Sequence, residues 1–183
     1  MRKIAAALLL ALFAITASAL EVGVTAGVNF KQADPYSFGG GCGFIVGPMT
    51  CTNSTNREEF GITVGQRAGP LGLNFGISRS SGGSPVTLPT DGPFKDNTQT
   101  RYSLGASYDV VKLGTSTVAV TVSETYLHNN RAANGFAANI GAEVRYPINK
   151  NVFLGLDYAR QYGQSAVKQF DGNRVGVKLV YSL

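Results

Sequence analysis

The last ten residues of the chain read Arg174-Val175-Gly176-Val177-Lys178-Leu179-Val180-Tyr181-Ser182-Leu183. Apolar residues occupy every second position from Val175 to Leu183, and the positions between them are polar or small except at Val180. Successive side chains of a β-strand point to opposite faces, so this alternation predicts a strand with one apolar and one polar face. Both soluble and membrane proteins contain such strands, so the rest of the sequence has to distinguish between them.

The N-terminus has the pattern of a secretory signal peptide. Met1-Arg2-Lys3 is followed by a short apolar run and then by Ala17-Ser18-Ala19. A basic start, an apolar core and an A-x-A site predict cleavage after Ala19. The alternatives are a signal anchor and a buried helix. We therefore expect a signal peptide over residues 1–19 and one mature domain over residues 20–183.

The charge balance and composition narrow the class of protein. The chain has 16 Lys+Arg and 11 Asp+Glu, and removing the two basic residues of the signal leaves 14 against 11, a net charge of +3. This mild excess comes without a basic run, so no nucleic-acid partner is predicted. Few segments have the apolar period of a helix, whereas glycine and β-branched residues are abundant. The fold class is therefore all-β, either a secreted sandwich or barrel, or a transmembrane barrel.

Eight segments show the two-residue alternation of a strand, and the connections between them alternate in length. An even number of strands about ten residues long, with short turns at one end and long loops at the other, is typical of a bacterial outer-membrane barrel. The strands are predicted at residues 21–31, 59–67, 71–79, 100–110, 117–127, 136–146, 152–161 and 174–183. The short connections are 68–70, 111–116 and 147–151, and the longer ones are 32–58, 80–99, 128–135 and 162–173.

The polarity of the two faces indicates which one points into the barrel. An eight-stranded barrel has an interior barely wide enough for side chains. The second face of the predicted strands carries Gly, Ser, Thr, Asn and charged residues, so we expect that face inside and the apolar face against lipid. Outward aromatic residues form two groups, which fit the two aromatic girdles of an outer-membrane barrel with periplasmic short turns. These groups are Phe30, Phe60, Tyr102, Tyr126 and Phe136 at the long-loop end, and Tyr108, Tyr146 and Tyr181 at the short-turn end.

In the last strand, Arg174, Gly176, Leu179 and Tyr181 approximate the C-terminal signal that outer-membrane barrels present to the barrel-assembly machinery. The mature chain thereby resembles the small eight-stranded outer-membrane barrel proteins of the OmpA and opacity-protein type. It departs from them in ending with Leu183, where an aromatic residue is typical. The resemblance implies an eight-stranded antiparallel up-and-down transmembrane β-barrel, exported through the periplasm of a Gram-negative cell and inserted by that machinery as a monomer.

Charged residues on the inward face predict a polar network in the lumen. Glu143, Arg145, Asp157, Arg174 and Lys178 have inward parity. If the last two strands pair, Asp157 is expected near Lys178. Buried charges persist when they are paired and hydrogen-bonded, so the network is predicted to be a structural plug. The alternative is a narrow path for ions or small solutes.

The two cysteines of the chain, Cys42 and Cys51, lie in the first long loop. An exported chain with an even number of cysteines predicts a disulfide between them. The alternatives are free thiols or a bound metal, but the loop offers no histidine and too few ligands for a metal site. We predict no cofactor and no metal.

Four residues with outward parity are not apolar. Arg79 and Arg160 lie at the upper ends of their strands, where arginines either extend to the headgroups or bind lipopolysaccharide phosphates. Glu124 and His128 are the best catalytic candidates, because lipid A deacylases are eight-stranded barrels with a lipid-facing Ser/His/Glu site. Their motif resembles His-x-Ser-Asn, and His128-Asn129-Asn130 lacks its serine. We therefore predict that the chain is not an enzyme, and Glu124 either turns inward at a bulge or lies near the outer headgroups.

The sequence therefore predicts a non-enzymatic outer-membrane protein with a structural or surface-interaction role. Its contacts would be outer-membrane lipid and lipopolysaccharide, and its extracellular loops could bind a ligand or a host surface, as a surface antigen does. A narrow, porin-like channel is the first alternative, and an enzyme that modifies outer-leaflet lipid is the second.

Overall fold

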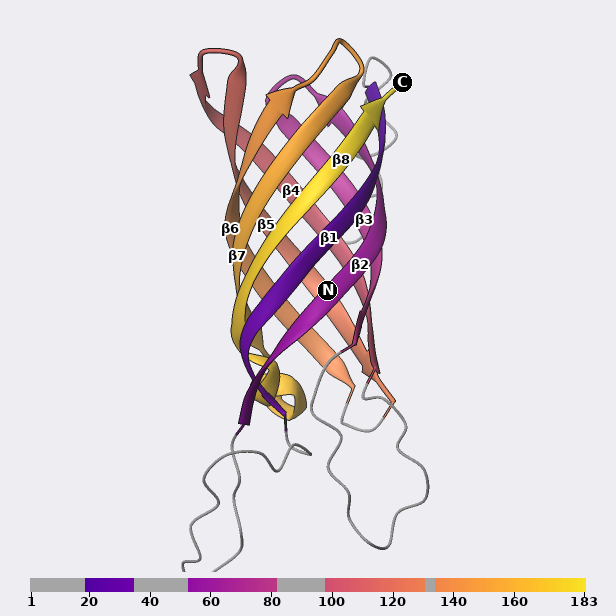
Figure 1. The fold of residues 1–183 in the computed structure, drawn as a ribbon, viewed down its shortest axis with the longest axis vertical. Coiled ribbons are helices and arrows are strands. Elements are labelled where there is room, and N and C mark those ends of the chain that lie inside the picture. The colour runs from indigo at the N-terminus through magenta and orange to yellow at the C-terminus, as the bar shows by residue number, and fades with distance from the viewer. Residues whose placement is uncertain (1–18, 35–52, 82–97, 131–133) are drawn as a thin grey trace, which may run out of the picture.

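The computed structural model describes residues 19–34, 53–81, 98–130 and 134–183. They form one closed barrel of eight strands, in which each strand pairs with its neighbours in the sequence (Figure 1). The strands are β1 Ala19–Asp34, β2 Asn53–Ala68, β3 Leu71–Ser81, β4 Thr98–Leu113, β5 Ser116–Asn129, β6 Gly135–Pro147, β7 Val152–Gly163 and β8 Gly172–Ser182. Among the described residues, no helix has the length and apolar character needed to cross a bilayer.

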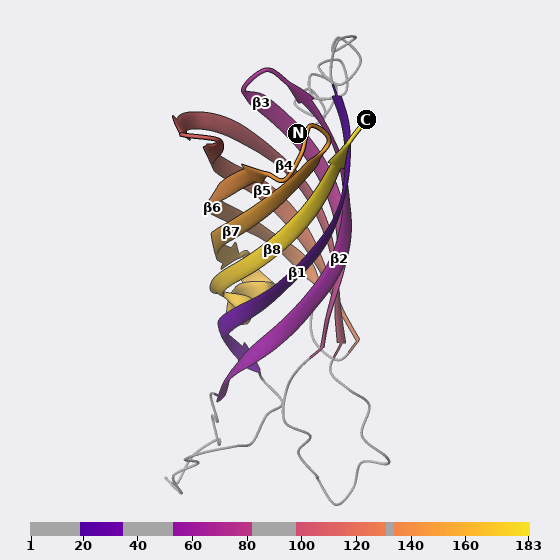
Figure 2. The same cartoon turned by 45° about the horizontal axis from the view of Figure 1, so that its top comes forward.

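The first and last strands close the barrel. β8 runs antiparallel to β1, with Val24 opposite Leu179 and Val28 opposite Val175. The two strands lie side by side in both views of the ribbon (Figures 1 and 2). Because the backbone of every strand is paired on both sides, the barrel has no open sheet edge. The predicted up-and-down antiparallel barrel is confirmed.

Two of the short turns depend on glycine. Gly69 joins β2 to β3 with φ +58°, and Gly114 joins β4 to β5 with φ +62°. This left-handed region is readily adopted only by glycine, so each hairpin can turn within two residues. The three short turns lie at one end of the barrel, and the connections at residues 35–52, 82–97 and 131–133 join strands at the other end (Figure 1).

Several strands are longer than predicted. β1 continues to Asp34, β2 begins at Asn53, and β4 reaches Leu113 through a bulge between Asp109 and Val111. Alternation of polarity stops where a strand leaves the apolar environment, although backbone pairing continues. The pattern therefore locates the membrane-facing part of each strand and misses its ends.

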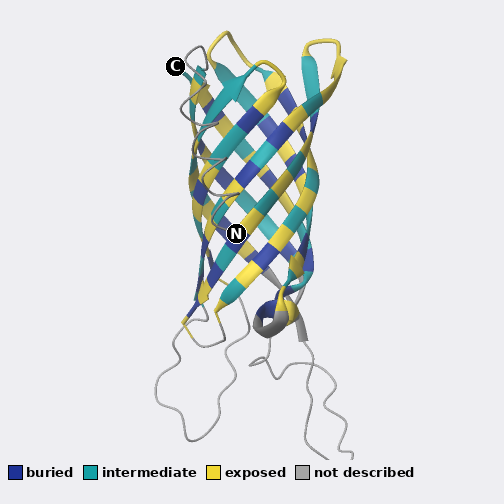
Figure 3. Ribbon diagram, turned by 180° about the vertical axis from the view of Figure 1, so that it is seen from behind, coloured by how far each residue is buried: buried dark blue, intermediate teal, exposed yellow. Residues whose placement is uncertain are grey.

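The two faces of the strands lie as predicted. Outward apolar side chains are exposed, with Val24 and Ile140 each 56% accessible, whereas the inward Ala119 is fully buried. Buried and exposed residues consequently alternate along each strand (Figure 3). On β8, Val175, Val177, Leu179 and Tyr181 face outward, and the off-type Val180 is buried inside.

The connection between β7 and β8 is not the simple loop that was predicted. It contains a 3-10 helix, η1, over Ser165–Phe170. Its residues Val167 and Phe170 are fully buried against the inward side chains of Leu127 and Ala137. A six-residue helix is too short to produce a recognisable apolar period, so the alternation could not reveal it.

Two predictions lie outside the described residues. They concern the signal peptide, most of which precedes residue 19, and the two disulfide partners Cys42 and Cys51. These remain predictions.

Candidate functional site: the polar interior

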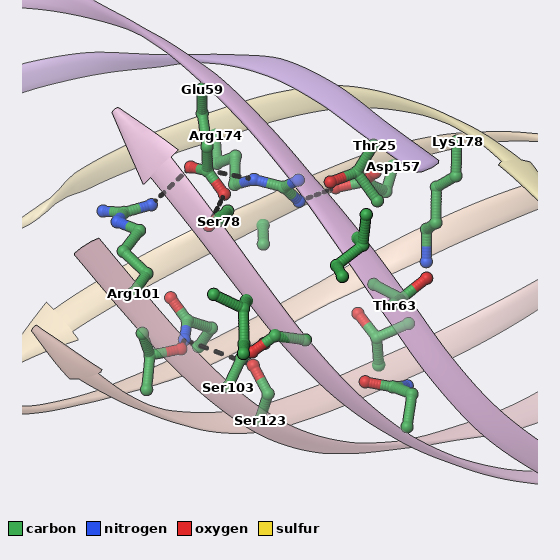
Figure 4. A pocket seen from close by; sticks show the side chains of 18 of the residues that line it. Thr25, Glu59, Thr63, Ser78, Arg101, Ser103, Ser123, Asp157, Arg174 and Lys178 are labelled. Atoms are coloured by element: carbon green, nitrogen blue, oxygen red, sulfur yellow. Dashed lines mark hydrogen bonds and ion pairs between the residues drawn. The ribbon is translucent and has the colours of Figure 1, made fainter. Parts of the chain in front are cut away.

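Glu59 on β2 is the centre of an ionic cluster near the long-loop end of the lumen, which is drawn at the bottom of Figure 1. We call it the upper cluster, and we call the long-loop end the upper end of the barrel. Its Oε2 accepts hydrogen bonds from Arg101 Nη1 at 2.7 Å and from Asn29 Nδ2 at 2.8 Å. Its Oε1 accepts from Ser78 Oγ at 2.7 Å, and Arg174 Nε lies 3.5 Å from Oε2. Figure 4 shows the carboxylate between the two guanidinium groups. These hydrogen bonds and the two neighbouring guanidinium groups stabilise the charged form of the buried carboxylate.

Arg101 on β4 extends this cluster across the lumen. Besides Glu59, its guanidinium donates to Asn29 Oδ1 at 2.9 Å, to Gln99 Oε1 at 2.9 Å and to Gln161 Oε1 at 2.8 Å. Gln99 Nε2 in turn donates to Asn129 Oδ1 at 2.8 Å. Side chains of several strands are thereby tied to one another through a single arginine and its partners.

The helix η1 covers the upper cluster from the long-loop end. Gln161 Nε2 donates to the carbonyl oxygen of Phe170 at 2.6 Å, and the guanidinium carbon of Arg57 lies 5.9 Å from the Phe170 ring. A Cβ atom added at Gly163 would clash with the carbonyl oxygen of Val167, so the helix packs directly on the end of β7. The helix η1 therefore lies at the long-loop end of the lumen, next to the buried ionic cluster.

Two further ion pairs connect β6, β7 and β8 in the middle of the lumen. Arg174 pairs with Asp157, and Lys178 pairs with Glu143. Asp157 and Lys178, which were expected near each other, line the same cavity, but each is paired with another residue. Backbone pairing places Gly176 opposite Asp157 and Gly155 opposite Lys178, so the lysine reaches across Gly155 to Glu143 on the next strand. All five residues predicted for the lumen network lie inside the barrel.

Glycines on the inward face leave the space that these side chains occupy. A Cβ atom at Gly176 would lie 2.7 Å from Asp157 Oδ1, and one at Gly155 would lie 3.0 Å from Glu143 Oε1. A larger residue at either position would therefore require the neighbouring carboxylate to shift. This is why long charged chains fit into so narrow an interior.

A lower ionic cluster lies near the short turns. Glu21 Oε1 accepts from Arg145 Nη2 at 2.7 Å and from Arg67 Nε at 3.3 Å. Arg67 Nη1 also donates to Asp109 Oδ1 at 2.8 Å. The guanidinium of Arg145 lies 5.0 Å from the ring centroid of Phe153, the one large aromatic residue with inward parity, which makes a cation–π contact. The lower end of the barrel is thus also filled by paired charges.

At least two cavities remain between the clusters in the described part of the barrel. The larger has a volume of about 120 Å³ and is lined by hydroxyl, amide and charged side chains together with apolar residues such as Ile62 and Ile77, and the smaller has about 50 Å³. Both are lined in part by Thr63, Asn74 and Lys178. A water molecule needs roughly 10–15 Å³ of such space, so both cavities have room for ordered water. The hydroxyl, amide and charged groups among the lining residues offer hydrogen-bond partners to such water.

Glu59 and Arg101 are the interior residues that sequence reasoning missed. Both have inward parity, since Glu59 shares a face with Gly61 and Thr63, and Arg101 with Ser103. Each lies near the predicted end of its strand. The side chains that each one contacts there come from strands that are distant in the sequence. Parity alone could have placed them inside, but not identified them as the centre of the cluster.

The four outward polar residues do face outward. Arg79, Glu124 and His128 are exposed, and Arg160 is half-buried. The register of β5 with β4 and β6 is unbroken around Glu124, which is opposite Leu104 and Ala138, so no bulge turns it inward. Within the described ranges, no group of three His, Cys, Asp or Glu side chains could hold a metal ion.

The residues predicted as an assembly signal occupy both faces of β8. Arg174 and Gly176 point inward, and Leu179 and Tyr181 point outward. Their part in assembly stays a prediction.

The closed barrel is similar to several solved structures. The crystal structure of Neisserial surface protein A superposes with a TM-score of 0.61 at 13% identity, covering 90% of this chain and 96% of that one. The N-terminal β-barrel domain of Pseudomonas aeruginosa OprF gives 0.54 at 15% identity, covering 90% and 97%. A major outer membrane protein from Thermus thermophilus gives 0.52 at 12% identity, covering 91% and 100%.

At this level of identity the likeness concerns the fold. The chain has the fold of the small eight-stranded outer-membrane barrels, as its resemblance to them predicted. No protein-family model matches the sequence, and no curated protein sequence matches it significantly.

Proposed function

We propose that the chain is an outer-membrane protein of a Gram-negative bacterium, exported after removal of residues 1–19. The observation that carries this proposal is the exterior of the barrel, where apolar side chains stay exposed on all eight strands. Ile62, Phe75, Leu104, Val122 and Ile140 are examples, each between 47% and 57% accessible. A surface of this kind is stable against hydrocarbon and would associate in water. The fold shared with outer-membrane barrels supports the same location.

The role we propose is non-enzymatic and structural, or one of surface interaction. The charges of the interior are engaged with one another, and both ends of the lumen are filled by ionic clusters. Contacts with a ligand or a host surface would then fall to the connections at the long-loop end, because loops on a rigid barrel usually carry recognition. Cys42 and Cys51 would constrain the first of these connections by a disulfide.

We further propose that Arg79 and Arg160 contact phosphate groups of lipopolysaccharide. Both side chains lie on the outward face near the long-loop ends of β3 and β7. Guanidinium groups suit the geometry of phosphate oxygens and hold them by paired hydrogen bonds. Replacing both arginines with glutamine should lower the lipopolysaccharide that co-purifies with the folded barrel.

Two measurements test the location and orientation. The folded protein should migrate differently in gels before and after heating. Protease added to intact cells should cleave the protein only within the connections at the long-loop end. Cleavage of the protein within its short turns on intact cells would indicate the opposite orientation. A deletion strain compared for adhesion, serum survival and detergent sensitivity then separates a surface-interaction role from a structural one.

Insertion would depend on β8, with Arg174, Gly176, Leu179 and Tyr181 as the signal for the barrel-assembly machinery. Removing residues 179–183 deletes the partners of Glu21 to Val24 on β1, so the barrel could not close. The truncated protein should accumulate in the periplasm. Insertion of the truncated protein with an intact heat-dependent gel shift would contradict this role.

A narrow channel is the second candidate, favoured by the two polar cavities that share Thr63, Asn74 and Lys178 in their walls. Ions would have to pass the upper cluster at Glu59 and the lower cluster at Glu21. Planar-bilayer recordings with a defined and reproducible conductance would support the channel over the closed structural barrel.

A further inference from the structure

A hydrogen-bonded polar cluster interrupts the apolar exterior of the barrel where β7 pairs with β8. Arg160 on β7 is opposite Asn173 on β8, and both have outward parity. The hydroxyl of Tyr158 donates to Asn173 Oδ1 at 3.0 Å, and Arg160 Nη1 donates to the same oxygen at 3.3 Å. We call these three residues the outer cluster.

The outer cluster lies among lipid-facing side chains. In the row of backbone partners, Ile140 on β6 is opposite Arg160, and Phe30 on β1 is opposite Asn173. The outward pairs toward the short turns are Tyr158–Val175, Leu156–Val177 and Leu154–Leu179. The cluster is therefore at the upper edge of the apolar belt, where the headgroups of outer-leaflet lipids lie in the proposed orientation.

Arg160 has neighbours that orient its guanidinium but none that neutralise it. Besides the bond to Asn173, the guanidinium lies 5.6 Å from the ring centroid of Tyr162. Among the residues that the structure describes, no carboxylate forms an ion pair with it. A cation on the lipid-facing surface is stabilised by an anion, and a side chain already held in place loses little freedom when it binds one.

The amide of Asn173 adds hydrogen-bond donors beside this charge. Its Oδ1 accepts two hydrogen bonds, which identifies the other amide atom as the nitrogen. Within residues 19–34, 53–81, 98–130 and 134–183, Nδ2 donates no hydrogen bond. The unused hydrogens of the amide and the guanidinium favour an anion with several acceptor oxygens.

Arg79, the other outward arginine, lacks such neighbours. It is exposed, and among the described residues its guanidinium makes no hydrogen bond, ion pair or ring contact. The residues opposite it are Phe60 and Thr100. An arginine that is free to rotate loses more conformational entropy on binding, so it should bind the same anion less tightly.

We propose that the outer cluster is the principal site of the barrel for a lipid A phosphate. Arg160 and Asn173 Nδ2 bind the phosphate oxygens, Tyr158 positions the amide, and the acyl chains lie below along Tyr158 and Val175. A phosphate monoester fits these donors because it presents three acceptor oxygens and a negative charge. This inference rests on the proposed function, to which it adds Tyr158 and Asn173 and a ranking of Arg160 above Arg79.

Native mass spectrometry of the folded mature barrel in detergent tests the site. The probes are lipid A with its phosphates, the same lipid A without phosphates, and phosphatidylglycerol as a competitor. The unaltered protein should retain the phosphorylated form roughly tenfold more than the dephosphorylated form, the factor that about 1.4 kcal/mol produces. Arg160→Gln should remove most of this ratio, whereas Arg79→Gln should lower it by less than about twofold.

Asn173→Asp distinguishes an amide that binds phosphate from one that only holds Arg160. The carboxylate still accepts both hydrogen bonds, so the guanidinium stays oriented, but the amide donors are lost and the new charge repels phosphate. The ratio should therefore fall to about one. Tyr158→Phe removes the hydroxyl that orients the amide and should lower the ratio roughly threefold. Tyr108→Phe, a matched change on the outward face near the short turns, should leave the ratio unchanged.

The gel shift on heating shows for each variant whether the barrel is folded. If the folded unaltered barrel retains neither form, or both forms equally, the proposed phosphate contacts fail together with the inference. A preference for the phosphorylated form that persists in Asn173→Asp, or that Arg79→Gln and Arg160→Gln lower equally, would overturn the inference alone. Displacement of lipid A by equimolar phosphatidylglycerol would overturn the lipid A assignment and give the site to a glycerophospholipid.

Discussion

The two ends of the lumen are filled by the same chemistry under different degrees of solvent exposure. At the upper end, the side chains of Glu59 and Arg101 are 6% and 4% accessible beneath η1. At the lower end, those of Glu21 and Arg67 are 17% and 16% accessible, and Asp109 reaches 22%. An ion pair shielded from water loses far more when one partner is removed, because the remaining charge has no solvent to replace it. Removing one partner should therefore lower the free energy of unfolding more in the upper cluster than in the lower cluster.

The largest effect should come from Glu59→Gln. The change leaves Arg101 and Arg174 without the carboxylate between them, and breaking a buried pair in this way typically costs about 3–5 kcal/mol. Urea unfolding of the barrel in lipid vesicles, followed by the gel shift on heating, measures the loss.

The double variant Glu59→Gln/Arg101→Gln is the control. It restores the balance of charge in the upper cluster, so it should recover a large part of the lost stability. A double variant that loses the sum of the two single effects would mean that the two residues act independently.

The next largest effect should come from Gly163→Ala, which changes the cover rather than the charges. The added methyl group meets the carbonyl oxygen of Val167 and displaces η1. Overpacking of this kind costs roughly 1–3 kcal/mol. Hydrogen exchange at Gln161 and Phe170 should quicken, while exchange in the lower half of the barrel should not change.

The cover and the buried pair should also be coupled. In the Gly163→Ala background, water reaches the upper cluster, so Glu59→Gln should cost less than in the unaltered chain. Additive costs would show that η1 does not keep the upper cluster dry.

A smaller effect is expected for Glu21→Gln at the lower end. Partly exposed ion pairs contribute about 0.2–1 kcal/mol each, and Glu21 has two arginine partners. Its effect on the urea midpoint should shrink at high salt, whereas that of Glu59→Gln should not, since buried pairs are screened less. Equal salt dependence at both ends would remove the distinction between them.

The smallest effect should come from Asp109→Asn. This carboxylate is the most exposed of the group, and Arg67 keeps Glu21 as its partner. The free energy of unfolding should change by less than about 0.5 kcal/mol. A loss as large as that of Glu59→Gln would show that accessibility does not set the energy of these pairs.

The sequence predicts those features of the structure that depend on the two-residue alternation along each strand. Alternation identified all eight strands, their order and their two faces, because facing lipid or lumen imposes the same period on every strand. It could not identify which charges pair. Whether Lys178 reaches Asp157 or Glu143 depends on the register of β6, β7 and β8 and on the space left by Gly155.

The cover of the upper cluster was equally hidden from the sequence. η1 is held by contacts with Leu127 and Ala137, which are far from it along the chain. The importance of Glu59 likewise arises from Asn29, Ser78, Arg101 and Arg174, contributed by four other strands. Such contacts follow from the closure of the barrel and have no local pattern.

The central claim is that the apolar face of the strands lies against lipid. The chain contains no tryptophan, so one introduced residue reports its own surroundings. Val120→Trp, on the outward face of β5, should fluoresce at short wavelength and be strongly quenched by brominated lipid; Ile148→Trp, in a short turn, should be quenched by aqueous acrylamide instead. Acrylamide quenching of tryptophan at position 120, without quenching by lipid, would contradict the membrane-spanning barrel.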